Sequence, residues 1–218
     1  MTSSRPIPAP FSLEGRCALV TGGSRGVGAA TSRLLASFGA HVGVLYRSRR
    51  ADADAMVGEL QQQGVRAVAV AADVGDPDAV ERAFDTVVAA LGGLELVVHS
   101  AGIWPPDDVP VHELSEARWH RTIRENVDGM FYVSRAAARR LGDGGRIVHI
   151  SSTAGQRGEA YHADYGASKG AMPLATSAMA GALTDTMTRS CGPKSAGLAD
   201  ALTFAFKCVS FVSNCACV

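Results

Sequence analysis

Short apolar runs alternate with segments of helical spacing from residue 16 to residue 172, and this alternation constrains the fold more than any other feature. The apolar runs have the length of strands and predict five of them, at 16–23, 40–47, 65–74, 94–102 and 144–152. Strands that alternate with helices form a parallel sheet with helices on both faces. The sequence therefore predicts a doubly wound α/β fold, which binds ligands outside the carboxyl ends of its strands.

Four helices can be placed from the same pattern. Residues 25–38 have the spacing of an amphipathic helix. Five of its side chains are predicted to face the sheet: Val27, Ala30, Leu34, Leu35 and Phe38. A second helix is predicted over 51–63, ended by Gly64, and Pro77 is predicted to open a third, because proline fits the first helical turn. A long helix is predicted over 115–141.

The composition argues against several classes of function. The chain has 218 residues, with 21 basic and 21 acidic side chains, so it offers no net charge for binding nucleic acid or an acidic membrane. It has no apolar run of membrane-spanning length. Residues 1–11 are rich in proline and serine and predict a disordered arm without a targeting signal, which favours a cytoplasmic protein.

The five cysteines are distributed unevenly, because four of them follow residue 190: Cys191, Cys208, Cys215 and Cys217. Their spacing matches no zinc-binding pattern, and no histidine follows His162. Free thiols and no metal site are therefore expected.

The segment "TGGSRGVG" (21–28) follows the first predicted strand and opens the first predicted helix. Gly22, Gly26 and Gly28 would let the backbone turn sharply and approach a pyrophosphate, while the helix N-terminus supplies free N–H groups. A glycine turn without a ligand could contain the same residues. The position between a strand and a helix favours a nucleotide site and specifies the fold as Rossmann-type.

The end of the second strand indicates which nucleotide is bound. An acidic side chain there would hold the ribose 2′-hydroxyl of NAD. Arg47 occupies the place instead, and Arg25 lies inside the glycine loop. Two guanidinium groups suit the 2′-phosphate of NADP, so NADP is favoured over NAD. The alternative is that both are ordinary solvated arginines.

Six short motifs, in order along residues 12–172, resemble those of the short-chain dehydrogenase/reductase family, in particular its NADP-dependent 3-oxoacyl-carrier-protein reductases. They are "TGGSRGVG" (21–28), "ADV" (72–74), "HSAG" (99–102), "ENVDG" (125–129), "ISS" (150–152) and "YGASK" (165–169). The resemblance implies a cofactor site formed by Gly22, Ser24, Arg25, Gly26, Val27, Gly28, Arg47, Asp73, Val74, Ala101, Gly102, Tyr165 and Lys169. His99 departs from the asparagine usual in the family and is expected to be structural. His162 could contact substrate or be an exposed loop residue.

The resemblance also implies a catalytic set of Asn126, Ser152, Tyr165 and Lys169. Tyr165 would be the acid/base, and Lys169 would favour its phenolate and hold the nicotinamide ribose. Ser152 would polarise the substrate oxygen, and Asn126 would anchor a water of a proton relay. Each could instead be an ordinary structural residue. Together they predict NADPH-dependent reduction of a carbonyl, or the reverse oxidation of an alcohol, in a homodimer or homotetramer like those of the family.

The resemblance stops after residue 172, which sets the predicted boundary between a domain at 12–172 and a tail at 173–218. The tail lacks the "IRVNxVxPG" stretch, the substrate lid and the last strands usual in the family, so the sixth and seventh strands are predicted to be missing. Two explanations stay open: a divergent natural tail, or a change of reading frame near residue 172. A nucleotide-binding protein without turnover is therefore the alternative function.

Pro173 stands one helical turn after Lys169. It has no N–H for the Lys169 carbonyl, and its ring crowds that carbonyl, at a cost of about 3 kcal/mol in a helix interior. The sequence therefore predicts that the helix bends or ends within one turn of Pro173.

Overall fold

The structure of this chain is a computed structural model, which describes residues 12–142 and 144–190. The predicted arm at 1–11 lies outside the described residues, as does the part of the tail after residue 190 in which further strands would fall. The chain divides into two compact units. The first contains the residues up to Gly102 together with Asp128–Val148, and the second contains Ile103–Val127 and the residues from His149 onward.

The described strands form one sheet of five strands in the order β3-β2-β1-β4-β5. They are β1 (Cys17–Thr21), β2 (His41–Tyr46), β3 (Ala67–Ala71), β4 (Leu96–His99) and β5 (Arg146–His149). β1 pairs in parallel with β2 and with β4, and β2 pairs in parallel with β3. The chain therefore builds the sheet outward in two directions from β1, and the carboxyl end of β1 is where such sheets bind ligands. The predicted Rossmann-type parallel fold is confirmed.

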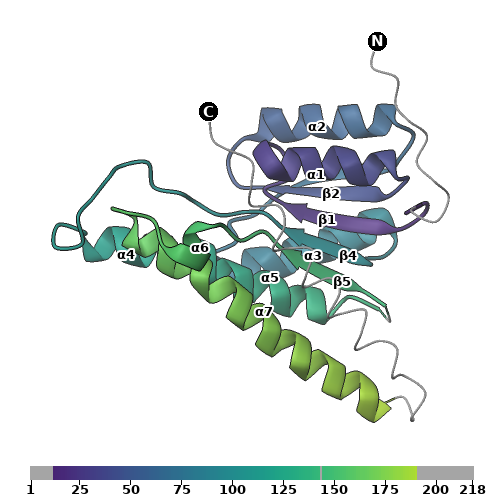
Figure 1. Cartoon of the computed structure of the whole chain (residues 1–218). Helices are drawn as coiled ribbons and strands as arrows, with labels where there is room; N and C mark the ends of the chain where they lie inside the picture. The colour runs from purple at the N-terminus through teal and green to yellow at the C-terminus, as the bar shows by residue number, and fades with distance from the viewer. Residues whose placement is uncertain (1–11, 143, 191–218) are drawn as a thin grey trace. The chain divides into compact units, whose positions relative to one another are not determined.

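Helices cover both faces of the sheet in the first unit. They are α1 (Gly26–Ser37), α2 (Arg50–Gln62), α3 (Pro77–Leu91) and α5 (Gly129–Ala138). Figure 1 places α1 and α2 on one face and α3 and α5 on the other. Pro77 opens α3 as predicted, and the Asp76 side chain caps the helix by accepting the backbone N–H groups of Asp78 and Ala79.

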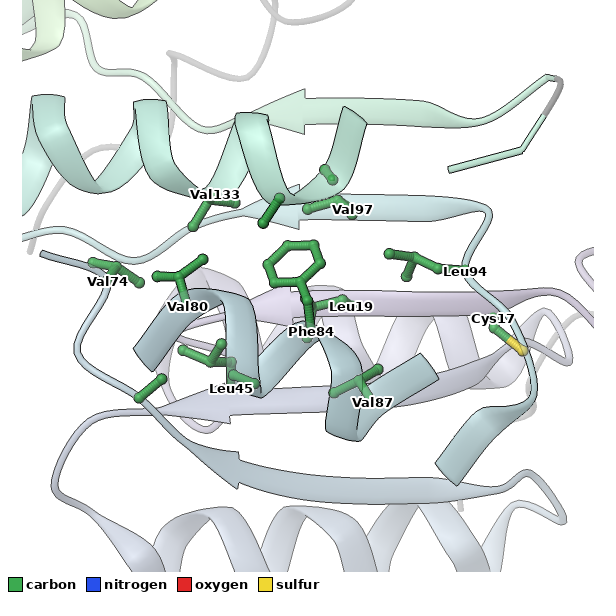
Figure 2. Packing of buried hydrophobic residues seen from close by; sticks show 14 of the residues in the cluster. Cys17, Leu19, Leu45, Val74, Val80, Phe84, Val87, Leu94, Val97 and Val133 are labelled. Carbon is green, nitrogen blue, oxygen red and sulfur yellow. The ribbon is translucent and has the colours of Figure 1, made fainter. Parts of the chain in front are cut away.

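The main core of the first unit lies between the sheet and the helices α3 and α5. Phe84 of α3 is fully buried, and Figure 2 shows its ring at the centre of the cluster, with Leu19, Val97 and Val133 around it. Burial of a side chain of this size contributes about 1.5–3 kcal/mol. This packing holds the strands in register, and the register fixes where each strand ends.

The face that α1 turns to the sheet differs from the predicted one. Of the five predicted side chains only Leu35 is buried, while Val27 and Leu34 are 57% and 56% exposed, Ala30 is exposed and Phe38 is half-buried. The buried positions are Gly28, Ala29, Ser32, Leu35 and Ala36. Most of these residues are small, because the start of α1 lies directly against the backbone of the glycine loop. Close approach, rather than apolar area, decides the orientation of this helix.

The second unit is helical and contains α4 (Glu116–Ile123), α6 (Ala154–Arg157) and α7 (Ala163–Ser190). The predicted long helix at 115–141 is present as α4, a π-helical turn at Arg124–Asp128, and α5 in succession. α7 does not end at Pro173: it continues to Ser190 and is drawn as one uninterrupted helix in Figure 1. Among the described helices, none combines the length and the apolar character needed to cross a membrane.

Candidate active site

The glycine loop of the first unit connects β1 to α1. Gly22 has φ of 66°, in the left-handed region that favours glycine. A Cβ on Gly28 would collide with the carbonyl oxygen of Gly22, so the first turn of α1 rests directly on the loop. Ser24, Arg25 and Val27 are at least partly exposed on this turn. The sequence predicted this compact cradle before the N-terminus of α1, and its shape suits a pyrophosphate.

Two buried hydroxyls that the sequence analysis missed hold the loop in place. Ser32 Oγ donates a hydrogen bond shared between the carbonyls of Gly23 and Gly28, at 3.1 and 3.0 Å. Thr21 Oγ1 accepts the N–H groups of Ser100 and Ala101, at 3.2 and 3.1 Å. Both hydroxyls form hydrogen bonds with backbone groups. A serine in a helix and a threonine in a strand are common, so the sequence does not indicate these bonds.

His99 lies at the end of β4, and its ring is fully buried. Its Nδ1 is 2.9 Å from Thr21 Oγ1, so it ties the end of β4 to the end of β1. This contact is of the kind expected of a structural residue, and that role of His99 stays a prediction.

The remaining predicted cofactor residues follow β2, β3 and β4. Arg47 comes directly after β2 and, like Arg25, is exposed. Asp73 comes after β3 and accepts the N–H of Gly75 at 2.9 Å, which fixes its carboxylate. Val74 is 5% exposed and packs in the core, so only its backbone could contact a ligand. Ala101 and Gly102 follow β4.

Tyr165 and Lys169 lie one turn apart at the start of α7, as predicted. Lys169 Nζ is 5.9 Å from the centre of the Tyr165 ring. The ammonium group donates to the carbonyl of Ile150 at 3.1 Å, while the side chain is 94% buried, at 6% exposure. Burial lowers the pKa of Lys169 to about 8, so the group is still mostly protonated at neutral pH.

His149, at the end of β5, is a buried neighbour that the sequence analysis did not single out. Its Nδ1 is 2.8 Å from Thr176 Oγ1, and that hydroxyl donates to the carbonyl of Met172 at 2.6 Å. The hydroxyl has one hydrogen, so the histidine is the donor through Nδ1–H. Burial, together with the charge of Lys169, lowers the pKa of His149 to about 4. The ring is therefore neutral at pH 7.

Ser152 lies in the segment between β5 and α6, and this segment is docked on α7. The hydroxyl of Ser152 accepts the N–H of Ala154 at 3.2 Å. The neighbouring Ser151 donates to the carbonyl of Lys169 at 2.9 Å. A Cβ on Gly155 would collide with the backbone of Lys169, so the two segments touch without side chains between them. Ser152 is thus held by the helical turn that carries Lys169.

Asn126 lies in the π-helical turn, a feature often found at functional sites, and is fully buried. Its side-chain amide both accepts from and donates to the backbone of Ile103, at 2.8 and 2.9 Å. It also donates to Ser168 Oγ at 2.9 Å, and Ser168 donates to the carbonyl of Tyr165 at 2.8 Å. Both N–H donors of the amide are therefore engaged in joining Ile103 to the Tyr165 turn.

Asp164, next to Tyr165, is a fully buried carboxylate that the sequence analysis missed. Its Oδ2 accepts from Thr122 Oγ1 at 2.8 Å and from Arg118 Nε at 3.2 Å. Burial opposes ionisation, but these hydrogen bonds, a backbone contribution from Tyr165 and the charge of Arg118 together lower the pKa of Asp164 below its ordinary value. The ion pair therefore fixes the start of α7 on α4. Its partners are 42 and 46 positions away, so no local pattern marks it.

His162 is buried, not exposed, at 2% exposure. Its ring stacks on Trp104 with centroids 5.2 Å apart, and its Nε2 is 2.9 Å from the carbonyl oxygen of Pro105. The ring therefore joins the segment after Ile103 to the segment before Tyr165.

The sheet topology and the glycine loop define the class of protein: a Rossmann-type α/β protein. The model of the short chain dehydrogenase family matches residues 16–190, and the chain belongs to this family. The match continues past residue 172, where the sequence predicted a domain boundary.

Similar proteins come from fungi and bacteria. The chain is 42% identical over 163 residues to versicolorin reductase of Emericella nidulans, covering 74% of this chain and 61% of that protein. It is 33% identical over 171 residues to general stress protein 39 of Bacillus subtilis, covering 78% and 59%. The chain thus spans about three-fifths of the length of these relatives.

Solved structures agree with these matches. A short chain dehydrogenase from Burkholderia cenocepacia, determined in complex with NADP, superposes with a TM-score of 0.76 at 41% identity, covering 79% of this chain and 70% of that one. A blue fluorescent protein from a metagenomic library, in complex with NADPH, gives a TM-score of 0.75 at 38% identity, covering 80% and 71%.

Proposed function

We propose that this chain is an NADP-dependent oxidoreductase that reduces a small carbonyl compound or, in reverse, oxidises an alcohol. The observation that carries the proposal is the placement of Lys169 one turn after Tyr165, buried and hydrogen-bonded to the carbonyl of Ile150. Such a lysine favours the phenolate of the tyrosine and makes it a usable acid/base near neutral pH. Membership of the family supports the same chemistry.

The cofactor is proposed from the cradle in the first unit. The close contact of Gly28 with the Gly22 carbonyl leaves the start of α1 open to a pyrophosphate. Arg25 and Arg47 are exposed after β1 and β2, which pair with each other, and they would bind the 2′-phosphate. Bound NADPH would supply the hydride for the carbonyl carbon.

The catalytic roles are proposed for side chains of the second unit. In the reducing direction Tyr165 would donate its phenolic proton to the substrate oxygen as that oxygen gains charge, and Ser152 would donate a hydrogen bond to the same atom. Lys169 would stabilise the resulting phenolate and contact the nicotinamide ribose. Asn126 would serve the site chiefly by holding Ile103 and Ser168, because both its N–H donors are used there.

A second candidate is a nucleotide-binding protein without turnover. It is favoured by one observation: after residue 172 the sequence shows no stretch like the "IRVNxVxPG" that is usual in the family. The predicted boundary at residue 172 stays a proposal in either case, as do the cytoplasmic location and assembly into a dimer or tetramer.

The test is NADPH oxidation with a panel of ketones, run beside an NADPH-binding titration. We expect turnover of at least one carbonyl, and a loss of about 10²–10⁴-fold in kcat for Tyr165→Phe with little change in NADPH affinity. Binding of NADPH without turnover of any carbonyl would favour the second candidate.

A further inference from the structure

Pro173 plays no part in the proposed function, yet it lies inside α7 one turn after Lys169. In an α-helix the N–H of residue 173 would donate to the carbonyl of Lys169. Proline has no N–H, so this carbonyl needs another donor. Ser151 is such a donor, since its Oγ lies 2.9 Å from the Lys169 carbonyl oxygen and donates to it.

The same turn of α7 receives two more contacts from the segment that carries Ser152. Lys169 Nζ donates to the carbonyl of Ile150 at 3.1 Å. The backbone of Gly155 lies so close to Lys169 and Gly170 that a Cβ there would collide with them. Residues 150–155 therefore meet the helix at its backbone, and the carbonyl of Lys169 is part of the contact. At this position the Ser151 hydroxyl takes the place of the helical N–H that Pro173 lacks.

We propose that Ser151 and Pro173 are a pair of positioning residues. Pro173 frees the Lys169 carbonyl, and Ser151 binds it, so that the segment of Ser152 is fixed to the turn of Lys169. The missing N–H of the proline is thereby a functional feature, and the Ser151 bond offsets the part of the cost of Pro173 in α7 that comes from the lost hydrogen bond. The effect of the pair on catalysis rests on the proposed function, in particular on the roles of Ser152 and Lys169. The energetic coupling between Ser151 and Pro173 does not depend on those roles.

A double-mutant cycle tests the coupling through thermal stability. Ser151→Ala in the Pro173 background leaves the Lys169 carbonyl without its donor, and we expect the Tm to fall by about 4 °C. In a Pro173→Ala background the new N–H can bind that carbonyl, so Ser151→Ala should lower the Tm by less than half as much. The Pro173 side chain is exposed, so its replacement removes little packing. Equal losses in the two backgrounds would overturn the pair.

The positioning role is tested through kcat. We expect Ser151→Ala to lower kcat about tenfold, with the Kd for NADPH changed less than twofold, because the misplacement affects the chemical step. Pro173→Ala should restore most of this loss, and Ser151→Thr, which keeps the hydroxyl, should retain activity. The matched control is Ser134→Ala, which removes a buried hydroxyl bonded to the Met130 carbonyl in the first unit. It should leave kcat unchanged.

The outcomes separate this inference from the proposed function. If the Tm loss from Ser151→Ala depends on Pro173 but kcat is unchanged in Ser151→Ala, the hydrogen bond only stabilises the fold. That result would overturn the positioning role. If the wild-type chain reduces no carbonyl, the proposed function fails, and the pair is judged from the Tm cycle together with NMR of ring-labelled tyrosine. The Tyr165 signal, identified with Tyr165→Phe, should then shift in Ser151→Ala and return in the double variant. An unmoved Tyr165 signal would contradict the positioning role.

If Ser151→Ala is insoluble alone but soluble with Pro173→Ala, the rescue supports the pair.

Discussion

At the scale of single residues, the candidate site contains buried charged side chains, whose burial costs free energy unless they have partners. Lys169 is almost fully buried, and its ammonium is retained at neutral pH by its hydrogen bond to Ile150 and the absence of a charged His149 beside it. Asp164 is equally buried and relies on Arg118 and Thr122. The pKa of Lys169 is lowered to about 8, so its charge state can be tested directly by varying the pH.

The pH dependence of carbonyl reduction follows from Lys169. Burial lowers its pKa from 10.5 to about 8, so the ammonium is present below about pH 8 and is lost above it. Because both the ammonium and a protonated Tyr165 serve the reducing direction, we expect kcat/KM to be level near neutrality and to fall as the pH rises through about 8. Steady-state rates measured against pH, with the folded fraction followed at each point, check this. A level profile that continues two units above pH 8 would contradict it.

The stability of the chain in acid follows from His149. Its folded pKa is about 4 against 6.5 for an ordinary histidine, so between these values the unfolded chain binds the extra proton. We expect this residue alone to remove about 3 kcal/mol from the free energy of unfolding as the pH falls from 6.5 to about 4.

Urea unfolding of wild type and His149→Asn across that pH range measures the effect. The variant should lose most of the slope, while the exposed His112→Asn control keeps it. An unchanged slope in His149→Asn would show that the histidine is not held neutral.

At the scale of elements, the glycine loop and α1 act as one unit because their backbones touch. Gly28→Ala would push a Cβ into the Gly22 carbonyl, and we expect it to destabilise the fold by about 1–3 kcal/mol and to weaken NADPH binding. The matched control is Gly58→Ala in α2, where a Cβ would meet nothing within 4 Å. That change should stabilise the helix by about 0.5–1 kcal/mol and leave NADPH binding alone. Denaturant unfolding and an NADPH titration distinguish the two variants. Equal changes in stability and in NADPH affinity would contradict the close contact between Gly28 and the glycine loop.

The same elements explain how far the sequence could predict the structure. The five strands and the order of motifs were predictable, because apolar runs and glycine spacing are local signals. The buried face of α1 was not, since it is set by backbone approach at Gly28 rather than by apolar spacing. Nor was the passage of α7 through Pro173, because the compensating donor, Ser151, lies in another segment. The pairing of the buried Asp164 with the half-buried Arg118 was missed for the same reason.

At the scale of the whole molecule, the cofactor candidates of the glycine loop and the strand ends belong to the first unit, and the catalytic set belongs to the second. Nucleotide preference should therefore be separable from acid/base chemistry by mutation. Arg47→Asp should weaken NADPH binding by at least about tenfold and improve NADH binding relative to it, because the change removes an attraction for the 2′-phosphate and adds a repulsion.

Equilibrium binding of both nucleotides measures this preference. Arg50→Asp makes the same change of charge at a nearby arginine that is paired with Asp54, and it should leave the preference unchanged. Equal effects of the two variants would show that only the overall charge matters.

We propose that this chain transfers a hydride from NADPH to a carbonyl with Tyr165 as the acid. The most direct measurement uses NADPH deuterated at the transferred position of the nicotinamide, a ketone that the chain turns over, and mass spectrometry of the product. We predict that the alcohol carries one deuterium on the former carbonyl carbon, and that Tyr165→Phe forms it about 10²–10⁴ times more slowly while still binding NADPH. Product without deuterium, or equal rates for Tyr165→Phe and wild type, would contradict the account.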